Sequence, residues 1–364
     1  DDEPHDEWSG YGWRYDAWST GSDGTNETDG YGYVYVAGIV RGSLHDAVFM
    51  GSTSASDMVL IKYHTNDGMR IWTKLLGVAD YSDLTYALAI HDQAIYLAGG
   101  TAAPELNGLA LTGYIDSVLM KFSTSGTLLW TTREGAVDGS AEAYAVAVDT
   151  LNNVVYVGGY TDSRMNGEGY NGGSYDMFII KYDALNGTRL WTRVVGTSEQ
   201  DEVNGLSVDS STGDLYVTGI VGGSIDGQTY MGSSTDAAIF KYASNGTRVW
   251  TRLLGTAGID QGIAVAIAHT PIASASAFYV AGVVEGSIDD ETYIGARDLF
   301  LAQYSLALPL VPSGQPTSQP SRQPTRSQDD GYINTVCQVH TYSLVSSPQT
   351  KFKRRRCIRT SPAQ

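Results

Sequence analysis

Hydrophobic residues alternate with small or polar ones in many short segments of the chain. The segments "YVYVAG", which begins at Tyr33, and "AYAVAVD", which begins at Ala143, both show this period of two. Such alternation is typical of β-strands that bury one face. No long segment has the 3.6-residue period of an amphipathic helix. The pattern therefore predicts an all-β protein.

Four strand patterns return in the same order along the chain. The first contains a tyrosine, and its copies are 61, 60, 60 and 63 residues apart (Tyr35, Tyr96, Tyr156, Tyr216 and Tyr279). The second opens with aspartate in five copies (Asp57, Asp116, Asp176, Asp236 and Asp298). The third carries "WT" in four copies (Trp72, Trp130, Trp191 and Trp250), each followed by a glycine, and the fourth alternates small and apolar residues, as in "TYALAIH". A repeat of this length indicates a solenoid or a propeller.

We predict a five-bladed β-propeller of four-stranded antiparallel blades, because stacking such sheets radially buries both faces of each sheet. An open β-solenoid is the competing fold. The fifth copy lacks the "WT" strand, and the segment that contains Trp8 and Trp13 has the spacing to supply it. An N-terminal strand is therefore predicted to close the ring. A further missing strand would fall at residues 24–30, "GTNETDG", a poor strand, so the fifth blade is expected to be incomplete.

The repeated residues have structural interpretations. Asn186-Gly187 and Asn245-Gly246 lie between two strands, as expected for a tight hairpin whose residues tolerate positive φ. The tryptophan that follows each such turn is predicted to pack between blades rather than to form part of a cofactor site. The aspartate that opens each second strand is predicted to accept backbone N–H groups in a turn.

Charge and composition divide the chain into a body and a tail. The net charge is −17; from Pro309 onward the tail has 8 − 2 = +6, so the body has 15 − 38 = −23. The acidic body disfavours a nucleic-acid partner. No apolar run is long enough to span a membrane, and the chain begins without Met or a signal peptide, as expected of a processed chain or a fragment.

The predicted domains are a propeller at residues 1–308, a Pro/Ser/Gln/Thr-rich linker or stalk at 309–328 and a basic tail at 329–364. Proline at every fourth position of the linker favours extended polyproline II structure. Cys337 and Cys357 are the two cysteines, and both lie in the tail, where a disulfide between them would close a short loop.

The repeat phrase resembles that of the SBBP beta-propeller family. The matching features are D-x-x-[LI]-x-K-[YF], a G-T turn, W-T-[RK], a glycine and [YV]-V-x-G, between about Tyr33 and Tyr304. The resemblance implies a propeller of secreted or cell-surface proteins, without agreed catalytic residues. The loops "GSLHDAVFMGSTSAS" and "NGEGYNGGSY" depart from the family phrase. The linker resembles the Pro-Ser-Gln-Pro-Thr tracts of secreted stramenopile proteins.

Candidate sites are few. Three sequons predict N-glycosylation at Asn26, Asn186 and Asn245, although Asn-Gly also serves the turn alone. Acidic residues follow the "WT" strands (Asp80, Asp83, Asp138, Glu142, Glu199, Asp201, Glu202 and Asp260). They could bind Ca²⁺ but match no calcium loop, and solvated turns are the favoured interpretation. No cofactor and no metal is predicted, and no motif of a nucleophile, phosphate-binding or zinc site occurs. The spacing of Asp183, Gly187 and Trp191 is similar to a quinoprotein docking motif, but the predicted blade number and the cysteine-free body argue against it.

We therefore expect a non-enzymatic, extracellular structural or adhesive glycoprotein, with the propeller subunit of a cell-surface filament or flagellar hair as the specific form considered. The expected partners are copies of the chain or other extracellular structural proteins, with no nucleic acid and no membrane span. A carbohydrate-binding propeller is the alternative, based on loop aromatics (Tyr114, Tyr170, Tyr175, Tyr230 and Tyr293). A secreted hydrolase is the weaker alternative, because no carboxylate pair can be singled out.

Overall fold

The computed structural model describes residues 17–21, 32–49, 55–91, 93–268, 277–288 and 297–306. It divides into two compact units, residues 1–134 and 135–364, each considered by itself. The described residues contain strands, turns and bends but no helix, and hence none long and apolar enough to cross a membrane. Trp8, Trp13, Asn26, Cys337 and Cys357 lie outside the described residues, as do the linker and the basic tail.

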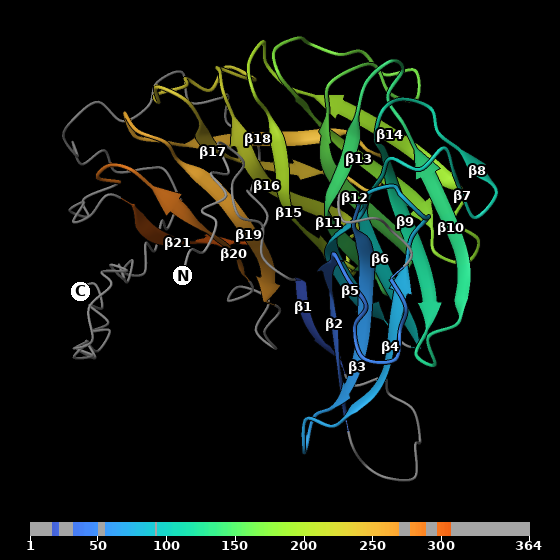
Figure 1. Cartoon of the computed structure of the whole chain (residues 1–364). Coiled ribbons are helices and arrows are strands. Elements are labelled where there is room, and N and C mark those ends of the chain that lie inside the picture. Colours follow the sequence, from blue (N-terminus) through green and yellow to red (C-terminus); the bar gives the residue numbers. More distant parts are fainter. Residues whose placement is uncertain are drawn as a thin grey trace, which may run out of the picture. The chain divides into compact units, whose positions relative to one another are not determined.

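The first unit contains two four-stranded antiparallel sheets and one small hairpin (Figure 1). The first sheet has the order β1 (Ala17–Gly21), β2 (Tyr33–Val40), β3 (Asp57–His64) and β4 (Arg70–Leu76). The second sheet consists of β5 (Asp83–His91), β6 (Ala94–Thr101), β9 (Asp116–Ser123) and β10 (Leu128–Glu134). The hairpin is β7 (Glu105–Leu106) with β8 (Leu109–Ala110).

The second unit repeats the same sheet. The third sheet has the order β11 (Ala141–Asp149), β12 (Val154–Thr161), β13 (Asp176–Asp183) and β14 (Arg189–Val195). The fourth consists of β15 (Glu202–Asp209), β16 (Asp214–Val221), β17 (Asp236–Tyr242) and β18 (Arg248–Leu254). The fifth has three described strands, β19 (Gln261–Ala268), β20 (Ala277–Val284) and β21 (Asp298–Ser305). The prediction of an all-β chain built from antiparallel four-stranded sheets is confirmed.

The N-terminal strand β1 joins the first sheet, whereas the ring-closing strand was predicted around Trp8 and Trp13, which lie outside the described residues. β1 pairs with β2 in the first sheet, from Ala17 opposite Ala37 to Gly21 opposite Tyr33. It therefore completes the first sheet, whereas the fifth sheet keeps three strands among the described residues. The first strand of this repeat also lies upstream of residues 24–30, where the sequence spacing had suggested it. A longer connection than in the other repeats separates it from the tyrosine strand, and this explains the error.

Within each sheet we count the strands in chain order: the first has the small-apolar pattern, the second the tyrosine, the third the opening aspartate and the fourth the "WT" phrase. In the second to fifth sheets the first strand carries a β-bulge at an equivalent position. The register shifts between Thr85 and Ala87, and likewise in β11, β15 and β19. The bulge presses a backbone carbonyl against a glycine of the second strand, where a Cβ would overlap the oxygen (Gly99 with Leu84, Gly159 with Glu142, Gly219 with Glu202, Gly282 with Gln261). The glycine of the [YV]-V-x-G phrase is therefore fixed by this close approach.

A short hairpin interrupts the connection between the second and third strands. Asn107-Gly108, Asn166-Gly167 and Asp226-Gly227 all have positive φ, as the central residues of a type I′ turn require. The flanking residues form β-bridges, such as Met165 with Glu168. The loops that depart from the family phrase therefore contain a regular element that the sequence prediction missed.

The turn residue of this hairpin is held by the threonine of the "WT" phrase. Asn107 Nδ2 donates to Thr131 Oγ1 at 2.9 Å, and Asn166 Nδ2 donates to Thr192 Oγ1 at 3.2 Å. His45 with Thr73 and Asp226 with Thr251 form the corresponding hydrogen bonds in the first and fourth sheets. The threonine thus repeats because it fastens the hairpin to the fourth strand of its own sheet.

The predicted Asn-Gly turns between the third and fourth strands also differ from expectation. Only the glycines, Gly187 and Gly246, have positive φ, and the asparagines do not. Gly246 N donates to Ala243 O at 2.9 Å, and Ala243 N donates to Thr247 O at 2.9 Å. This is a type I turn followed by a left-handed glycine, so the asparagine needs no positive φ.

Hydrophobic clusters join neighbouring sheets within each unit. One cluster combines residues of the first and second sheets, including Tyr35, Leu60 and Phe122. In the second unit, one cluster joins the third and fourth sheets and another joins the fourth and fifth. Within each unit, neighbouring sheets therefore complete a shared core.

The bulge contact predicts a large difference between two glycines of the third repeat. Gly159→Ala should lower the free energy of unfolding by about 1–3 kcal/mol or more, because the new methyl group overlaps Glu142 O. Gly169→Ala, where nothing lies within 4 Å of a built Cβ, should change it by less than about 0.5 kcal/mol. Chemical denaturation measures both. Equal effects would contradict the proposed role of the bulge.

Candidate functional site at the junctions between sheets

A row of three side chains crosses each of the first four sheets. In the third sheet Tyr156 lies opposite Lys181, which lies opposite Trp191. Lys181 Nζ is 5.2 Å from the Tyr156 ring centroid, and the Tyr156 and Trp191 centroids are 5.8 Å apart. The same register holds for three further rows (Tyr35, Lys62 and Trp72; Tyr96, Lys121 and Trp130; Tyr216, Lys241 and Trp250). In all four rows the lysine ammonium group thus lies over the ring of the tyrosine.

In the third sheet the row reaches a turn of the fourth sheet. Lys181 Nζ and Trp191 Nε1 both donate to Ser244 O, at 2.9 and 3.1 Å, and Arg193 Nε donates to Gly246 O at 2.9 Å. The Trp191 ring also lies against Gly246, where a Cβ would be 3.1 Å from it. Between the first and second sheets, Lys62 Nζ donates to Thr124 O at 3.4 Å.

The four tryptophans are partly buried. Trp72, Trp191 and Trp250 pack against the clusters that join neighbouring sheets. Trp250 additionally stacks on Phe278 of the fifth sheet, with ring centroids 6.0 Å apart.

Buried aspartates form a second layer beside the rows. The five aspartates that open the third strands are all buried. The carboxylates of Asp116, Asp176 and Asp236 accept backbone N–H groups from the preceding loop, for example from Asn171 N at 2.5 Å and from Met231 N at 2.8 Å. Each carboxylate therefore fastens the end of the loop that precedes its strand.

Three further buried aspartates, Asp83, Asp201 and Asp260, lie where the next sheet begins. Asp201 accepts Thr197 N at 2.5 Å and Gly222 N at 3.2 Å, so it joins the connecting loop to β16. The glycine after the "WT" strand faces both aspartates of a junction. A Cβ on Gly77 would lie 2.7 Å from Asp57 Oδ1 and 2.8 Å from Asp83 Oδ2. That glycine is therefore required because two carboxyl groups leave no space for a side chain.

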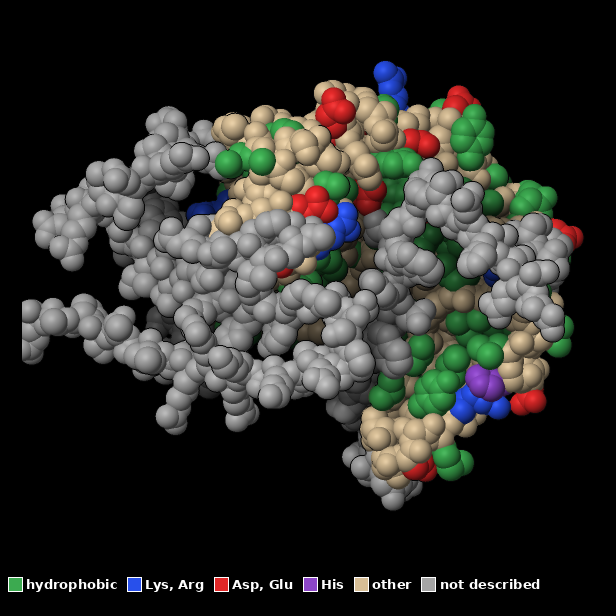
Figure 2. Space-filling model, turned by 60° about the vertical axis from the view of Figure 1, so that its left-hand side comes forward, with side chains coloured by type: hydrophobic (Ala, Val, Ile, Leu, Met, Phe, Trp, Pro, Cys, Tyr) green, Lys and Arg blue, Asp and Glu red, His purple; other side chains and the backbone are tan. Residues whose placement is uncertain are grey.

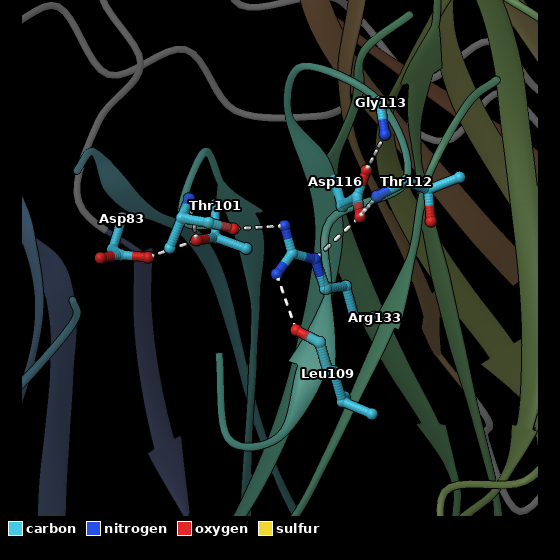
Figure 3. Close-up of polar contacts among 8 residues, drawn as sticks. Asp83, Thr101, Leu109, Thr112, Gly113, Asp116 and Arg133 are labelled. Carbon is cyan, nitrogen blue, oxygen red and sulfur yellow. Dashed lines mark hydrogen bonds and ion pairs between the residues drawn. The ribbon is translucent and has the colours of Figure 1, made fainter. Parts of the chain in front are cut away.

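In the second sheet an arginine neutralises the buried aspartate. Arg133 Nε donates to Asp116 Oδ2 at 2.8 Å, and both side chains are buried (Figure 3). The guanidinium group also donates to Leu109 O at 3.0 Å and Ala103 O at 2.7 Å. At the position of Arg133, the first, third and fourth sheets have Leu75, Val194 and Leu253.

Burial shifts the acidity of these carboxyl groups. Desolvation raises the pKa of Asp201 to about 6, and it raises the pKa of Asp83, Asp176 and Asp236. The neighbouring carboxylate raises it further at Asp83, Asp201 and Asp236. A pair of anions in such surroundings is costly without a proton or a cation. Because all these groups are buried, they do not face a substrate in solution.

A cluster in the third sheet was not predicted from the sequence. Tyr160 Oη donates to Glu142 Oε1 at 2.6 Å, and its ring lies 4.3 Å from that of Tyr175 and 5.3 Å from that of Tyr144. Burial and the adjacent Glu142 carboxylate raise the pKa of Tyr160. Glu142 comes from the loop acids of the sequence analysis, but its partner could not be identified without the register of β11 and β12.

The predicted glycosylation positions are exposed where they are described. Asn186 and Asn245 occupy equivalent turns of the third and fourth sheets. The Oδ1 atom of each accepts a backbone N–H two residues later, at 2.9 Å, from Thr188 and Thr247. Because only the oxygen is used in the turn, the amide nitrogen stays available for a glycan.

The loop tyrosines of the carbohydrate hypothesis do not form one group. Tyr114 is 68 % exposed, whereas Tyr170 and Tyr230 are partly buried, and Tyr170 Oη donates to Gly173 O at 2.7 Å. Tyr175 belongs to the Tyr160 cluster, and Tyr293 lies outside the described residues.

Hydrophobic side chains also reach the surface, as the face drawn in Figure 2 shows. In the fourth strand of each of the first four sheets, an exposed apolar residue directly precedes the tryptophan. The exposed fractions of these residues are 39, 53, 50 and 53 % (Ile71, Leu129, Leu190 and Val249). The fourth strand is the edge strand of its sheet. These residues therefore form an exposed apolar position on four sheet edges.

Comparisons with known proteins agree with the repeat. Residues 129–164 match the family model of the SBBP beta-propeller repeat, which confirms the resemblance seen in the sequence. The chain is 27 % identical over 168 residues to the regulatory protein FlaEY of Caulobacter vibrioides; the match covers 43 % of this chain and 17 % of that protein. The chain thus corresponds to a small part of that relative's length.

Similarity to solved structures is weak. The quinohemoprotein alcohol dehydrogenase of Comamonas testosteroni is 13 % identical, with a TM-score of 0.36 and coverage of 68 % of this chain and 39 % of the other. The T136A mutant of Synechocystis apocarotenoid oxygenase (ACO) is 12 % identical, with a TM-score of 0.39 and coverage of 79 % of this chain and 58 % of the other. Likenesses this weak carry no argument about function. The repeat match, together with the repeated antiparallel sheets, identifies a β-propeller repeat protein.

The contact of Trp191 with the fourth sheet predicts the effect of removing this indole. Trp191→Ala should lower the free energy of unfolding by about 3 kcal/mol, because the ring packs on the fourth sheet and Nε1 bonds to Ser244 O. Leu190→Ala, at the half-exposed neighbouring position, should change it by less than about 0.5 kcal/mol. Urea unfolding of both variants tests this, and a small loss for Trp191→Ala would exclude a supporting role for the indole.

Proposed function

We propose that this β-propeller repeat protein is a non-enzymatic, glycosylated structural or adhesive protein of the cell surface. Its five repeats are the blades of one propeller. It binds copies of itself or other extracellular structural proteins, and the specific form that we propose is the propeller subunit of a cell-surface filament or flagellar hair.

The observation that carries this proposal is the regular apolar position on the edge strands. Leu190 and Val249 are half exposed and lie at equivalent places in β14 and β18. Basic residues flank them, Arg189 and Arg193 in β14 and Arg248 in β18. Unpaired strand edges with apolar side chains are sites of association between chains. An acidic body is electrostatically complementary to these basic flanks.

The repeated polar residues support a structural role, because their chemistry is used within the fold. The lysine of each row contacts aromatic rings, and Lys181 also bonds to the next sheet. The recurring aspartates bind backbone N–H groups, as Asp176 and Asp236 illustrate. The positions that repeat and stay exposed are the edge residues and the two asparagine turns.

A carbohydrate-binding propeller is the second candidate. The partly exposed rings of Tyr144 and Tyr175, which pack on the buried Tyr160–Glu142 pair, offer a surface on which a sugar ring can stack and favour it. Binding on a glycan array that is lost in Tyr175→Ala would support this candidate. An array without any bound glycan would remove it.

Self-association should depend on the edge positions. We expect the full chain to associate at micromolar concentration in sedimentation velocity. The double variant Leu190→Ser/Val249→Ser should dissociate at least about tenfold more easily, since two half-exposed apolar contacts are lost. Leu151→Ser is the control, because Leu151 is 70 % exposed but lies in a turn rather than on an edge strand. A chain that stays monomeric throughout would overturn the filament proposal.

Glycosylation should occur at the two equivalent turns. Mass spectrometry of the native protein, after enzymatic release of N-glycans, should show conversion of Asn186 and Asn245 to aspartate, because both side chains are exposed. The edge positions Leu190 and Val249 test association separately. Unmodified asparagine at both positions in material from the native source would exclude the glycoprotein part of the proposal.

A further inference from the structure

The two faces of the fifth sheet have different surroundings. One face packs on the fourth sheet, where the ring centroids of Phe278 and Tyr216 are 4.6 Å apart. The register of β19, β20 and β21 brings a second set of residues together on the other face, which we call the open face (Ala264, Ala266, Tyr279, Ala281, Val283, Leu299, Leu301 and Gln303). All of them except Gln303 are hydrophobic, and none is charged, although a strand face that meets water is usually polar.

The open face contains leucines at positions that the other repeats bury. Leu299 and Leu301 are 40 and 51 % exposed. Counted from the aspartate that opens each third strand, their counterparts in the third sheet are Met177 and Ile179, which are 0 and 1 % exposed. The corresponding residues of the first and fourth sheets are buried too (Met58, Leu60, Ala237 and Ile239). The fifth sheet therefore exposes hydrophobic positions that are buried elsewhere in the repeat.

In the second unit a neighbouring sheet covers these counterparts. Ile179 of the third sheet shares a hydrophobic cluster with Leu215 and Val217 of the fourth. Ile239 of the fourth sheet shares another cluster with Val280 of the fifth. In both junctions the third strand of one sheet packs on the tyrosine-bearing second strand of the next. The partner that fits the open face is therefore a further sheet of this repeat.

The first sheet carries a surface of the kind that receives such a strand. Val34 and Val36 of β2 hold the positions that Leu215 and Val217 hold in β16, counted from the tyrosine of each strand. The valines alternate with Tyr35, which belongs to the cluster with the second sheet, so they lie on the opposite face, which we call the valine face. Leu215 and Val217 are fully buried, whereas both valines are only partly buried.

We propose that the open face of the fifth sheet binds the valine face of the first sheet on a second copy of the chain. Exposed, contiguous hydrophobic surface is typical of a site of protein association. Because two different surfaces meet in this contact, copies join head to tail, and the contact repeats until a ring closes or a filament forms. The inference rests on the self-association in the proposed function but assigns it to a surface other than the edge strands.

The salt dependence of association should separate this contact from the edge contact. The open face has no charge and the body of the chain is strongly acidic, so added salt screens the repulsion between copies. Association through the open face should therefore strengthen about twofold or more between 50 and 500 mM NaCl. Association through the edge strands should weaken instead, because it uses the attraction of Arg189 and Arg248 to the acidic body.

The direct test is sedimentation velocity of full-length variants that each block one surface. Leu299→Ser/Leu301→Ser blocks the open face, and Val34→Ser/Val36→Ser blocks the valine face. Both are made on the background of the edge-strand double variant, in which the edge contact is weakened. Each alone should need at least about tenfold higher concentration to associate than that background. An equimolar mixture should restore association and stop at 1:1 dimers, because each variant keeps one working surface.

Leu185→Ser on the same background is the matched control. Leu185 is 79 % exposed but lies in a turn outside both faces, so this variant should associate like the background. Dimers of the Val34→Ser/Val36→Ser variant alone would show that two open faces meet each other and would overturn the proposal. Association that only the edge-strand substitutions weaken would leave the proposed function standing and overturn this inference.

Hydroxyl-radical footprinting of the unaltered chain gives a reading without substitutions, in case a variant does not fold. Oxidation of Leu299 and Leu301 should fall several-fold when the chain is concentrated above its association range. Low oxidation of both leucines in the monomer would show that the chain covers the open face by itself and would contradict the proposal. A chain that never associates would overturn both this inference and the filament proposal.

Discussion

The second unit depends on the contact between the Tyr–Lys–Trp row of the third sheet and a turn of the fourth sheet, and the first unit has a related contact through Lys62. A four-stranded sheet has two apolar faces and cannot bury both by itself. The row determines which surface packs against one face of the third sheet. Lys181 and Trp191 both donate to the carbonyl group of Ser244, and the Trp191 ring packs on Gly246. A neighbour that lacks a tight turn with glycine at this position would lose both hydrogen bonds and the packing of the indole ring. The repeat phrase therefore encodes the interface between sheets as well as each sheet.

A second layer, made of buried carboxyl groups, fixes the loops that connect the sheets. Asp201 joins the loop after β14 to β16, and Asp260 does the same for the loop after β18 through Thr256 and Glu285. Burying these charges is costly, and the chain offsets the cost in different ways in different repeats. Arg133 neutralises Asp116, whereas Asp236 and Asp260 lie together without such a partner among the described residues. The sheets therefore pack in the same way in each repeat, whereas the groups that compensate the buried carboxylates differ from one repeat to the next.

The sequence predicted the strands and their order well, because alternation and a repeat of about 60 residues report directly on pleated, half-buried elements. It missed features that depend on register. The type I′ hairpin at Asn166-Gly167 lies inside what looked like an irregular loop, and the bulge opposite Gly159 has no local signature. The first strand of the first repeat was expected at residues 24–30 but is β1, because the spacing of the other repeats does not reveal a longer connection. For the site, the recurring aspartates could be found in the sequence, but the pairing of Asp236 with Asp260 and the cluster around Tyr160 required the arrangement of separate strands.

The central claim is that each row stabilises the neighbouring sheet as well as its own. Native-state hydrogen exchange of the variant Lys181→Met tests this most directly, because Lys181 belongs to the third sheet and donates to Ser244 in the fourth. The account predicts that amide protection decreases together in β12, β13, β16 and β17, since removal of the bond uncouples the two sheets. A loss of protection confined to β12 and β13, with β16 and β17 unchanged, would contradict it.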